Sequence, residues 1–308
     1  MSDTSIGIIW NPSKTDAALL RDAVDKTFGN AAEGIRWWET SVDDPGTGMA
    51  QEAVEAGCGT VVAVGGDGTV RAVAEALAGT GVSLGIVPRG TGNLLARNLA
   101  VPLDDLAGAL ARIAADESTA IDLGWVSLDD GPEHAFAVMV GFGIDAQMLS
   151  ETDDDLKDRA GWLAYVEAMG RAMAGTEMTD IVLEIDGDEP QDVRGHTMII
   201  GNCGMIQGGL RLLPDARLDD GMLDLLLVSS DGALQWLETV RSVVWDNGIL
   251  RRLTGGDKAV STESTRHLTA ESLRVQLASP LTFEIDGEEL GDVSTIAVRV
   301  QAAALQVL

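Results

Sequence analysis

The sequence has little positive charge. Its 308 residues include 21 Lys and Arg against 49 Asp and Glu, so the net charge is −28, and only four of the basic residues are lysines. Proteins that bind nucleic acids rely on Lys and Arg to neutralise phosphates. We therefore expect no nucleic-acid partner.

Cysteines and long apolar runs are also scarce. The two cysteines, Cys58 and Cys203, are too few for a disulfide framework and are typical of a reducing cytoplasm. No apolar run reaches the roughly 18 residues that a membrane-spanning helix needs, and the polar first residues do not resemble a signal peptide. We expect a cytoplasmic protein without a transmembrane segment, whose membrane contact is peripheral, at the inner face.

The acidic, lysine-poor composition resembles that of proteins from extreme halophiles. In such hosts molar salt screens charge repulsion to within about 3 Å. The sequence thus favours a halophilic protein over one whose acidic surface is merely solvated.

The length predicts two domains, because a single core rarely serves about 300 residues. In the first part of the chain apolar strand-like runs alternate with helical patterns, which predicts an α/β domain with a parallel sheet. Its ligand should lie at the carboxyl ends of the strands. The expected strands are 6–10, 34–39, 60–64 and 83–87, and the expected helices are 17–28, 49–56, 70–78 and 105–115.

After about residue 120 strands dominate, which predicts a mainly antiparallel β-sandwich. We place the domains at 1–122 and 123–308, an arrangement that lets the last strand return toward the first domain. Two helices, 158–174 and 233–245, are expected between the strands, and the second is apolar enough to be core or a lipid-facing surface. The expected strands are 124–127, 135–140, 181–185, 198–201, 223–228, 273–277, 281–285 and 295–300.

Two glycine-rich loops follow successive strands of the first domain. The first is Gly65-Gly66-Asp67-Gly68-Thr69, and the second is Gly90-Thr91-Gly92-Asn93. Glycine lets the backbone approach a phosphate, and a helix N-terminus favours its negative charge. One such loop could be an ordinary turn, but two on neighbouring strand ends favour phosphate binding. A Gly-x-Gly-x-x-Ala match at 141–146 lacks the strand–loop–helix context of a dinucleotide site.

Acidic residues occur in two kinds of turn. Asp186-Gly187-Asp188 and Asp286-Gly287-Glu288 each follow an apolar strand, which predicts hairpins. A carboxylate at such a turn could accept the proton of a phosphoryl acceptor, and the residues alone do not choose between the two turns. The acid-rich stretch 214–224 could hold a hard cation or be a solvated turn.

Together these motifs resemble the diacylglycerol kinase catalytic family, which includes sphingosine kinases and the bacterial YegS-like lipid kinases. The resemblance covers most of the chain. It rests on both glycine loops and on further stretches that look like family motifs: Asn11-Pro12, 140–146, Gly161 to Tyr165, Gly201-Asn202, Gly208-Gly209 and 214–224. Two departures are Gln207 where a third glycine is usual and Arg71 where a polar residue such as Asn is common.

The resemblance implies an ATP-dependent lipid kinase with a nucleotide site between its domains. It implies a structural Mg²⁺ held by Asp220 and by the carbonyls of Arg217 and Met222. It favours Asp286 and Glu288 over Asp186 as the catalytic carboxylates, with either one as the general base. The nucleotide-binding residues it implies are Asn11, Thr40, Gly65, Gly66, Asp67, Gly68, Thr69, Val70, Arg71, Thr91 and Asn93.

The predicted reaction is phosphoryl transfer to a lipid hydroxyl at the membrane surface, as in phospholipid biosynthesis. Diacylglycerol, a dialkylglycerol ether lipid and a sphingoid-type base are all compatible acceptors, and a homodimer is compatible with the sequence. The alternatives are an NAD kinase, which shares the first glycine loop, and a non-catalytic nucleotide- or lipid-binding protein.

Overall fold

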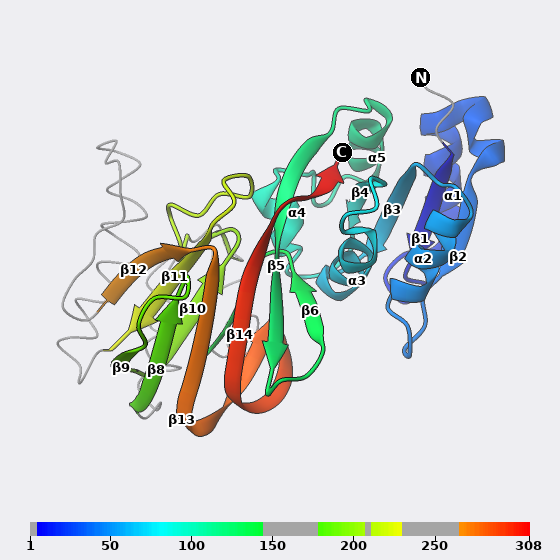
Figure 1. The fold of residues 1–308 in the computed structure, drawn as a ribbon. Helices are drawn as coiled ribbons and strands as arrows, with labels where there is room; N and C mark the ends of the chain where they lie inside the picture. Colours follow the sequence, from blue (N-terminus) through cyan, green and yellow to red (C-terminus); the bar gives the residue numbers. More distant parts are fainter. Residues whose placement is uncertain (1–4, 144–177, 207–210, 230–264) are drawn as a thin grey trace, which may run out of the picture. The chain divides into compact units, whose positions relative to one another are not determined.

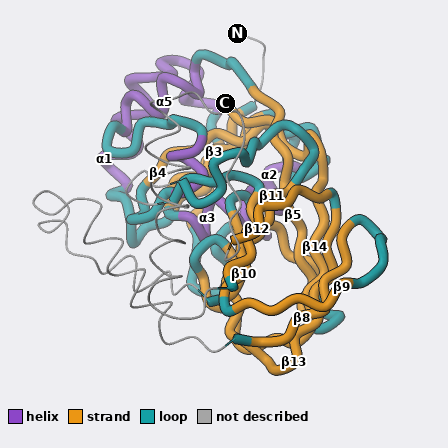
Figure 2. Tube along the Cα trace, turned by 90° about the vertical axis from the view of Figure 1, so that its left-hand side faces the viewer, coloured by secondary structure: helices purple, strands orange, loops and turns teal. Residues whose placement is uncertain are grey.

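The computed structural model describes residues 5–143, 178–206, 211–229 and 265–308 (Figures 1 and 2). The chain forms two compact units. The first unit comprises Met1–Leu123, Leu218–Asp220 and Gln301–Leu308. The second comprises Gly124–Arg217 and Gly221–Val300.

The first unit contains a parallel sheet with the strand order β2-β1-β3-β4, extended by the end of β14. β3 is fully buried, and β4 is buried beyond its first residue, which accounts for their continuous apolar sequences. The expected strands are confirmed, with small changes at their ends. They are β1 (Ile6–Trp10), β2 (Arg36–Glu39), β3 (Thr60–Gly65) and β4 (Ser83–Pro88).

The expected helices of this unit are also confirmed. They are α1 (Ala17–Phe28), α2 (Thr47–Glu55), α3 (Asp67–Leu77) and α5 (Leu106–Ala114). The short α4 (Leu94–Asn98) and the 3-10 helix η1 (Gly29–Gly34) were not predicted from the sequence.

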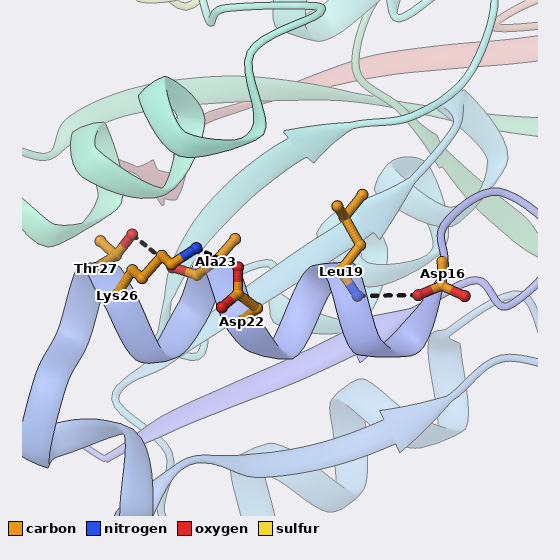
Figure 3. Close-up of polar contacts among 6 residues, drawn as sticks. All are labelled: Asp16, Leu19, Asp22, Ala23, Lys26 and Thr27. Atoms are coloured by element: carbon orange, nitrogen blue, oxygen red, sulfur yellow. Dashed lines mark hydrogen bonds and ion pairs between the residues drawn. The ribbon is translucent and has the colours of Figure 1, made fainter.

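Helix α1 shows how local sequence sets its bounds. Asp16 caps it by accepting a hydrogen bond of 2.9 Å from the Leu19 N–H (Figure 3). Leu20, Val24 and Phe28 recur every four residues and are buried. On the exposed side Lys26 pairs with Asp22, one turn earlier (Figure 3).

The second unit is mainly antiparallel, in the order β12-β11-β10-β7-β13-β14, with β8 and β9 added beside β13 and with β6 paired to β5. Its strands curve around a common apolar core (Figure 2). They are β5 (Thr119–Leu128), β6 (Glu133–Phe136), β7 (Met139–Phe142), β8 (Thr179–Ile185), β9 (Gln191–Gly195), β10 (Thr197–Gly201), β11 (Leu223–Val228), β12 (Thr265–Ala270), β13 (Ser272–Ile285) and β14 (Glu288–Val307).

Three predicted strands were wrong in extent. The expected strands 273–277 and 281–285 form one strand, β13, whose register shifts between Gln276 and Leu281. Its first half pairs with β8 and its second half with β7. The register shift lies between these halves, so one strand pairs with two different neighbours on the same side. The expected strand 295–300 is the middle of the much longer β14.

The expected strand 135–140 is two strands, β6 and β7, separated by Ala137 and Val138. The N–H groups of both residues donate to the carboxylate of Asp286. β9 and β12 were missed, and the helices expected at 158–174 and 233–245 lie outside the described residues.

A buried carboxylate ties distant segments of the first unit together. Asp122 is 2% exposed, and its Oδ1 accepts a 2.7 Å hydrogen bond from the Ala303 N–H. Its own N–H donates to the Leu218 carbonyl at 2.6 Å. The segments that contain Asp122, Leu218 and Ala303 are thus held at one point, although they are far apart in sequence.

We predict that Asp122→Ala lowers the free energy of unfolding by about 1–3 kcal/mol, because the Ala303 N–H loses its acceptor. Denaturant titration measures this. The control is Asp104→Ala at an exposed position, expected to change stability by less than about 0.5 kcal/mol. Equal stability of the two variants would contradict the structural role of Asp122.

Candidate active site

The two glycine loops touch each other at the carboxyl ends of β3 and β4. A Cβ atom placed on Gly90 would lie 2.6 Å from the Cα of Gly66, closer than side-chain carbons approach. The Arg89 N–H also donates to the Gly65 carbonyl at 2.8 Å. Only glycine permits this approach, so the sequence pattern is explained by loop-to-loop packing as well as by ligand access.

Asp67 fastens the second loop to the first. Its carboxylate accepts hydrogen bonds from the Asn93 N–H at 2.7 Å and from the Leu94 N–H at 2.6 Å. Leu94 begins α4, so Asp67 satisfies donors at the start of that helix. The side chain of Asn93, whose φ is 47°, in turn accepts from the Gly90 N–H at 2.8 Å. Asp67 and Asn93 therefore shape the loops, whatever else they contact.

The start of α3 offers backbone donors to an anion. The first N–H groups of a helix have no acceptor within it, and in α3 they belong to Asp67, Gly68 and Thr69. The next N–H, that of Val70, already donates to the Gly66 carbonyl at 3.0 Å. This arrangement can bind a phosphate group.

The other predicted nucleotide residues of this unit lie at the same edge of the sheet. The Asn11 N–H donates to the Val64 carbonyl at 2.9 Å, and the Thr40 N–H donates to the Trp10 carbonyl at 3.0 Å. Asn11 and Thr40 thus follow β1 and β2 where those strands end. The fold gathers the predicted set from four strand ends: Asn11, Thr40, Gly65 to Arg71, Thr91 and Asn93.

A hollow of about 800 Å³ lies elsewhere in this unit, between α1 and α5. Leu19, Asp22, Ala23 and Lys26 line its α1 side, and they lie along the face drawn in Figure 3. None of the predicted site residues lines it, so its size alone gives it no role in the chemistry.

Burial raises the pKa of Asp67 above its ordinary value, although hydrogen bonds from the Leu94 and Asn93 N–H groups act in the opposite direction. A carboxyl whose pKa is raised on folding binds its proton more tightly in the folded state. Its contribution to stability is therefore full below the unfolded pKa of about 3.8 and is lost as pH rises through the folded pKa.

We accordingly predict that wild type loses stability relative to Asp67→Asn as pH rises from below 3.8 through the interval just above it. The measurement is the difference in free energy of unfolding between the two proteins at several pH values. Asp104→Asn, at an exposed position, serves as the control. A difference that does not vary with pH would contradict the shift.

In the second unit the Asp286-Gly287 turn joins β13 to β14. Asp286 and Gly287 have φ values of 48° and 87°, as both central residues of a type I′ hairpin require. Ile285 and Glu288 pair across the turn. The predicted hairpin is thus confirmed, and so is its counterpart at Asp186-Gly187.

The Asp286 side chain is turned inward and is 7% exposed. One carboxylate oxygen accepts from the Val138 and Met139 N–H groups at 3.0 and 2.9 Å, and the other accepts from the Ala137 N–H at 3.0 Å. These bonds satisfy backbone donors at the break that separates β6 from β7. Asp286 therefore fixes the backbone around the turn.

The carbonyls of Ala137 and Val138 accept hydrogen bonds from Asn202. The Asn202 N–H donates to the Val138 carbonyl at 2.8 Å, and its side-chain amide donates to the Ala137 carbonyl at 3.2 Å. Cys203 is buried beside them. Its burial, and secondarily the charge of Asp286, raise the pKa of the Cys203 thiol well above its ordinary value. Cys203 is thus kept as a neutral thiol and belongs to the support of the turn.

Glu288 differs from Asp286 because its side chain is exposed. Asp186 supplies a comparison, since its Oδ1 accepts from the Glu271 and Ser272 N–H groups at 2.8 and 2.7 Å. In both Asp-Gly turns, then, the aspartate binds neighbouring backbone. The two turns differ in that Asp286 is buried and Asp186 is exposed, while the acids that follow, Glu288 and Asp188, are both exposed.

The predicted metal ligands are divided between the units: Asp220 belongs to the first, and Arg217 and Met222 to the second. Among the described residues no group of three or more His, Cys, Asp or Glu side chains could hold a metal ion. One carboxylate with backbone carbonyls is nevertheless an all-oxygen set that suits a hard cation such as Mg²⁺. The magnesium site stays a prediction.

One further sequence motif, at 140–146, can be assessed in part. Gly141 lies in β7 beside β10, where a Cβ atom would be 2.1 Å from the Met198 carbonyl oxygen. Close strand packing therefore explains this glycine. Residues 144–146, 161–165 and 207–210 of the other motifs lie outside the described residues.

In the described part of the chain, no helix has the length and apolar character to cross a membrane.

Sequence reasoning missed the inward orientation of Asp286 and the bridge made by Asp67. Both depend on segments remote in sequence, so spacing could not reveal them. It also passed over Arg89, which directly precedes the second loop. A cation directly before a phosphate-binding type of loop could have indicated it.

Comparisons with known proteins agree with this architecture. Residues 5–126 match the model of the diacylglycerol kinase catalytic domain, and residues 138–308 match that of the YegS C-terminal NAD kinase beta sandwich-like domain. A structure of a diacylglycerol kinase from Bacillus anthracis superposes with a TM-score of 0.71, at 18% identity, covering 100% of this chain and 97% of that one. At that identity the likeness shows the fold.

Curated relatives extend the match over nearly the whole chain. A protein of Xanthomonas campestris named "Probable lipid kinase YegS-like" is 33% identical over 291 residues, covering 91% of this chain and 88% of the relative. One of the same name from Pseudomonas aeruginosa is 35% identical over 262 residues, covering 82% of this chain and 76% of the relative.

The diacylglycerol kinase catalytic domain followed by this sandwich defines a lipid kinase. The chain belongs to the YegS-like lipid kinase family, and the predicted resemblance is confirmed.

Proposed function

We propose that this lipid kinase transfers the γ-phosphoryl group of ATP to the hydroxyl of a lipid. The observation that carries the proposal is the contact between the two glycine loops, with the donors of α3 beside them, in a chain of this family. Diacylglycerol, a dialkylglycerol ether lipid and a sphingoid-type base are all compatible acceptors.

The first unit binds the nucleotide in this proposal. The N–H groups of Gly68 and Thr69 at the start of α3 contact phosphate oxygens, while Asp67 keeps the second loop against the first. Most of the catalysis in phosphoryl transfer comes from such positioning and from charge neutralisation. Mg²⁺ would supply further neutralisation of the phosphates when bound, and Asp220 with the Arg217 and Met222 carbonyls would hold a structural ion.

The second unit supplies the carboxylates. Glu288 acts as the general base that takes the proton of the acceptor hydroxyl, because its side chain is exposed to an acceptor whereas Asp286 is buried and binds the backbone of Ala137, Val138 and Met139. Asp286 holds the turn that presents Glu288. The acceptor is a lipid, so the proposal includes peripheral contact with a membrane surface, and it is compatible with a homodimer.

The test is transfer of label from γ-labelled ATP, with Mg²⁺ and molar salt, to extracted lipids and separately to NAD. Label in the organic phase supports the proposal and leads directly to the identity of the lipid. Label on NAD alone would establish an NAD kinase. Binding of ATP with no transfer to either acceptor would contradict the proposal and favour a binding protein.

We predict that Glu288→Gln lowers phosphoryl transfer by about 100-fold or more while leaving stability nearly unchanged, because the side chain is exposed and glutamine keeps its size but removes its basicity. Glu289→Gln, at the adjacent exposed position, is the matched control and should retain activity. Transfer rates and denaturant titrations are measured on the same preparations.

The Asp286→Ala variant separates the two carboxylates. It should lower the free energy of unfolding by about 1–3 kcal/mol, because three N–H groups lose their acceptor. If Glu288→Gln lost stability and Asp286→Ala were as stable as wild type, Glu288 and not Asp286 would be the carboxylate that holds the turn.

We also propose that the protein is halophilic. With a net charge of −28, repulsion among acidic residues opposes folding in dilute buffer and is screened in about 1 M salt. Stability and lipid phosphorylation should both rise from dilute buffer to molar KCl, as followed by thermal unfolding and by the labelled transfer assay. Full activity in dilute buffer would refute this.

A further inference from the structure

Arg89 lies where the two glycine loops meet. It follows β4 directly and precedes Gly90, and its N–H donates to the Gly65 carbonyl at 2.8 Å. The backbone of Arg89 is thus fixed by the first loop, and its side chain starts from the carboxyl-end edge of the sheet.

The Arg89 side chain is held by a residue from another segment. Its Nε donates to the Thr15 hydroxyl oxygen at 3.1 Å, and Thr15, located between β1 and α1, is only 5% exposed. Guanidinium carries five N–H donors, of which this bond uses one. A single fixed Nε orients the whole planar group, since its two terminal nitrogens lie in the same plane.

The charge of Arg89 has no counterpart in the part of the chain that the structure describes. Among the residues that the structure describes, no carboxylate lies within ion-pair distance of it, although the chain has 49 acidic residues. The side chain is half-buried, so water compensates its charge only in part. A half-buried, pre-oriented and unpaired guanidinium is suited to an anionic ligand.

Nearby arginines are engaged differently. The Arg97 Nε donates to the Gly92 carbonyl at 2.6 Å, and its charge acts on Asp67, so it stabilises the loops themselves. Arg112 donates to the Leu99 carbonyl at 2.9 Å from α5. Arg89 is distinguished by terminal N–H groups that are not committed to protein acceptors among the described residues.

We propose that Arg89 binds a phosphate group of the nucleotide, with Thr15 as the positioning residue that orients its guanidinium. This inference rests on the proposed function for the identity of the anion, and it adds a side-chain cation to a site otherwise built from backbone N–H groups. The alternative is a purely structural arginine that supports the Thr15 turn.

The test is calorimetric binding of ATP, inorganic tripolyphosphate and adenosine in molar salt to wild type, Arg89→Gln, Arg89→Lys and Thr15→Val. Arg89→Gln should weaken binding of ATP and tripolyphosphate about tenfold or more, as for loss of a charged hydrogen bond, and should leave adenosine unchanged. Arg89→Lys and Thr15→Val should weaken the same two ligands less. Arg112→Gln, at a half-buried arginine on α5, is the control and should match wild type.

The outcomes separate the two proposals. Unchanged binding of ATP and tripolyphosphate by Arg89→Gln would overturn the role of Arg89, and so would an equal loss for adenosine, which indicates structural damage. Wild-type protein that binds ATP but phosphorylates no lipid would overturn the proposed function. The role of Arg89 in phosphate binding would still be supported if its variants lost affinity for ATP and tripolyphosphate but not for adenosine. Wild-type protein that binds neither ATP nor tripolyphosphate would overturn both.

Discussion

Carboxylates that accept backbone N–H groups from remote segments are the interaction on which both units depend. Asp67 holds the start of α4 against the first glycine loop, Asp286 holds the break between β6 and β7, and Asp122 holds β14 through the Ala303 N–H. Loops cannot satisfy their N–H groups through a regular ladder, so charged acceptors stabilise them instead. At each site the aspartate supplies an acceptor that regular secondary structure does not provide.

This use of aspartate bears on the extreme composition. The net charge of −28 does not come from solvated surface acids alone, because Asp67, Asp122 and Asp286 accept hydrogen bonds from remote backbone N–H groups. Asp286 and Asp186 occupy the same kind of turn and both bind backbone, although Asp286 is buried and Asp186 is exposed. What sets the 286–288 turn apart is therefore the burial of its aspartate, which leaves Glu288 as the exposed acid of that turn.

Regular elements were predictable because their signals are local. The buried strands β3 and β4 have uninterrupted apolar sequences. In α1 the capping residue Asp16 is followed by apolar residues at helical spacing, which form its buried face. The glycine loops could be recognised for the same reason, and so could the two Asp-Gly hairpins. The division of 135–140 into two strands could not, because the acceptor that interrupts it, Asp286, is nearly 150 residues away.

The same limit explains why the site could be only partly assigned. Residue type indicated Asp286 and Glu288 equally, and only the inward direction of one side chain distinguishes them. Arg89 was hidden for a related reason: its Nε is held by Thr15, 74 residues earlier, and its lack of a carboxylate partner among the described residues is a property of the fold. In a protein so rich in acids, a half-buried arginine is expected to have a carboxylate partner among its neighbours. A phosphate of the substrate would supply the negative charge that Arg89 lacks among the described residues.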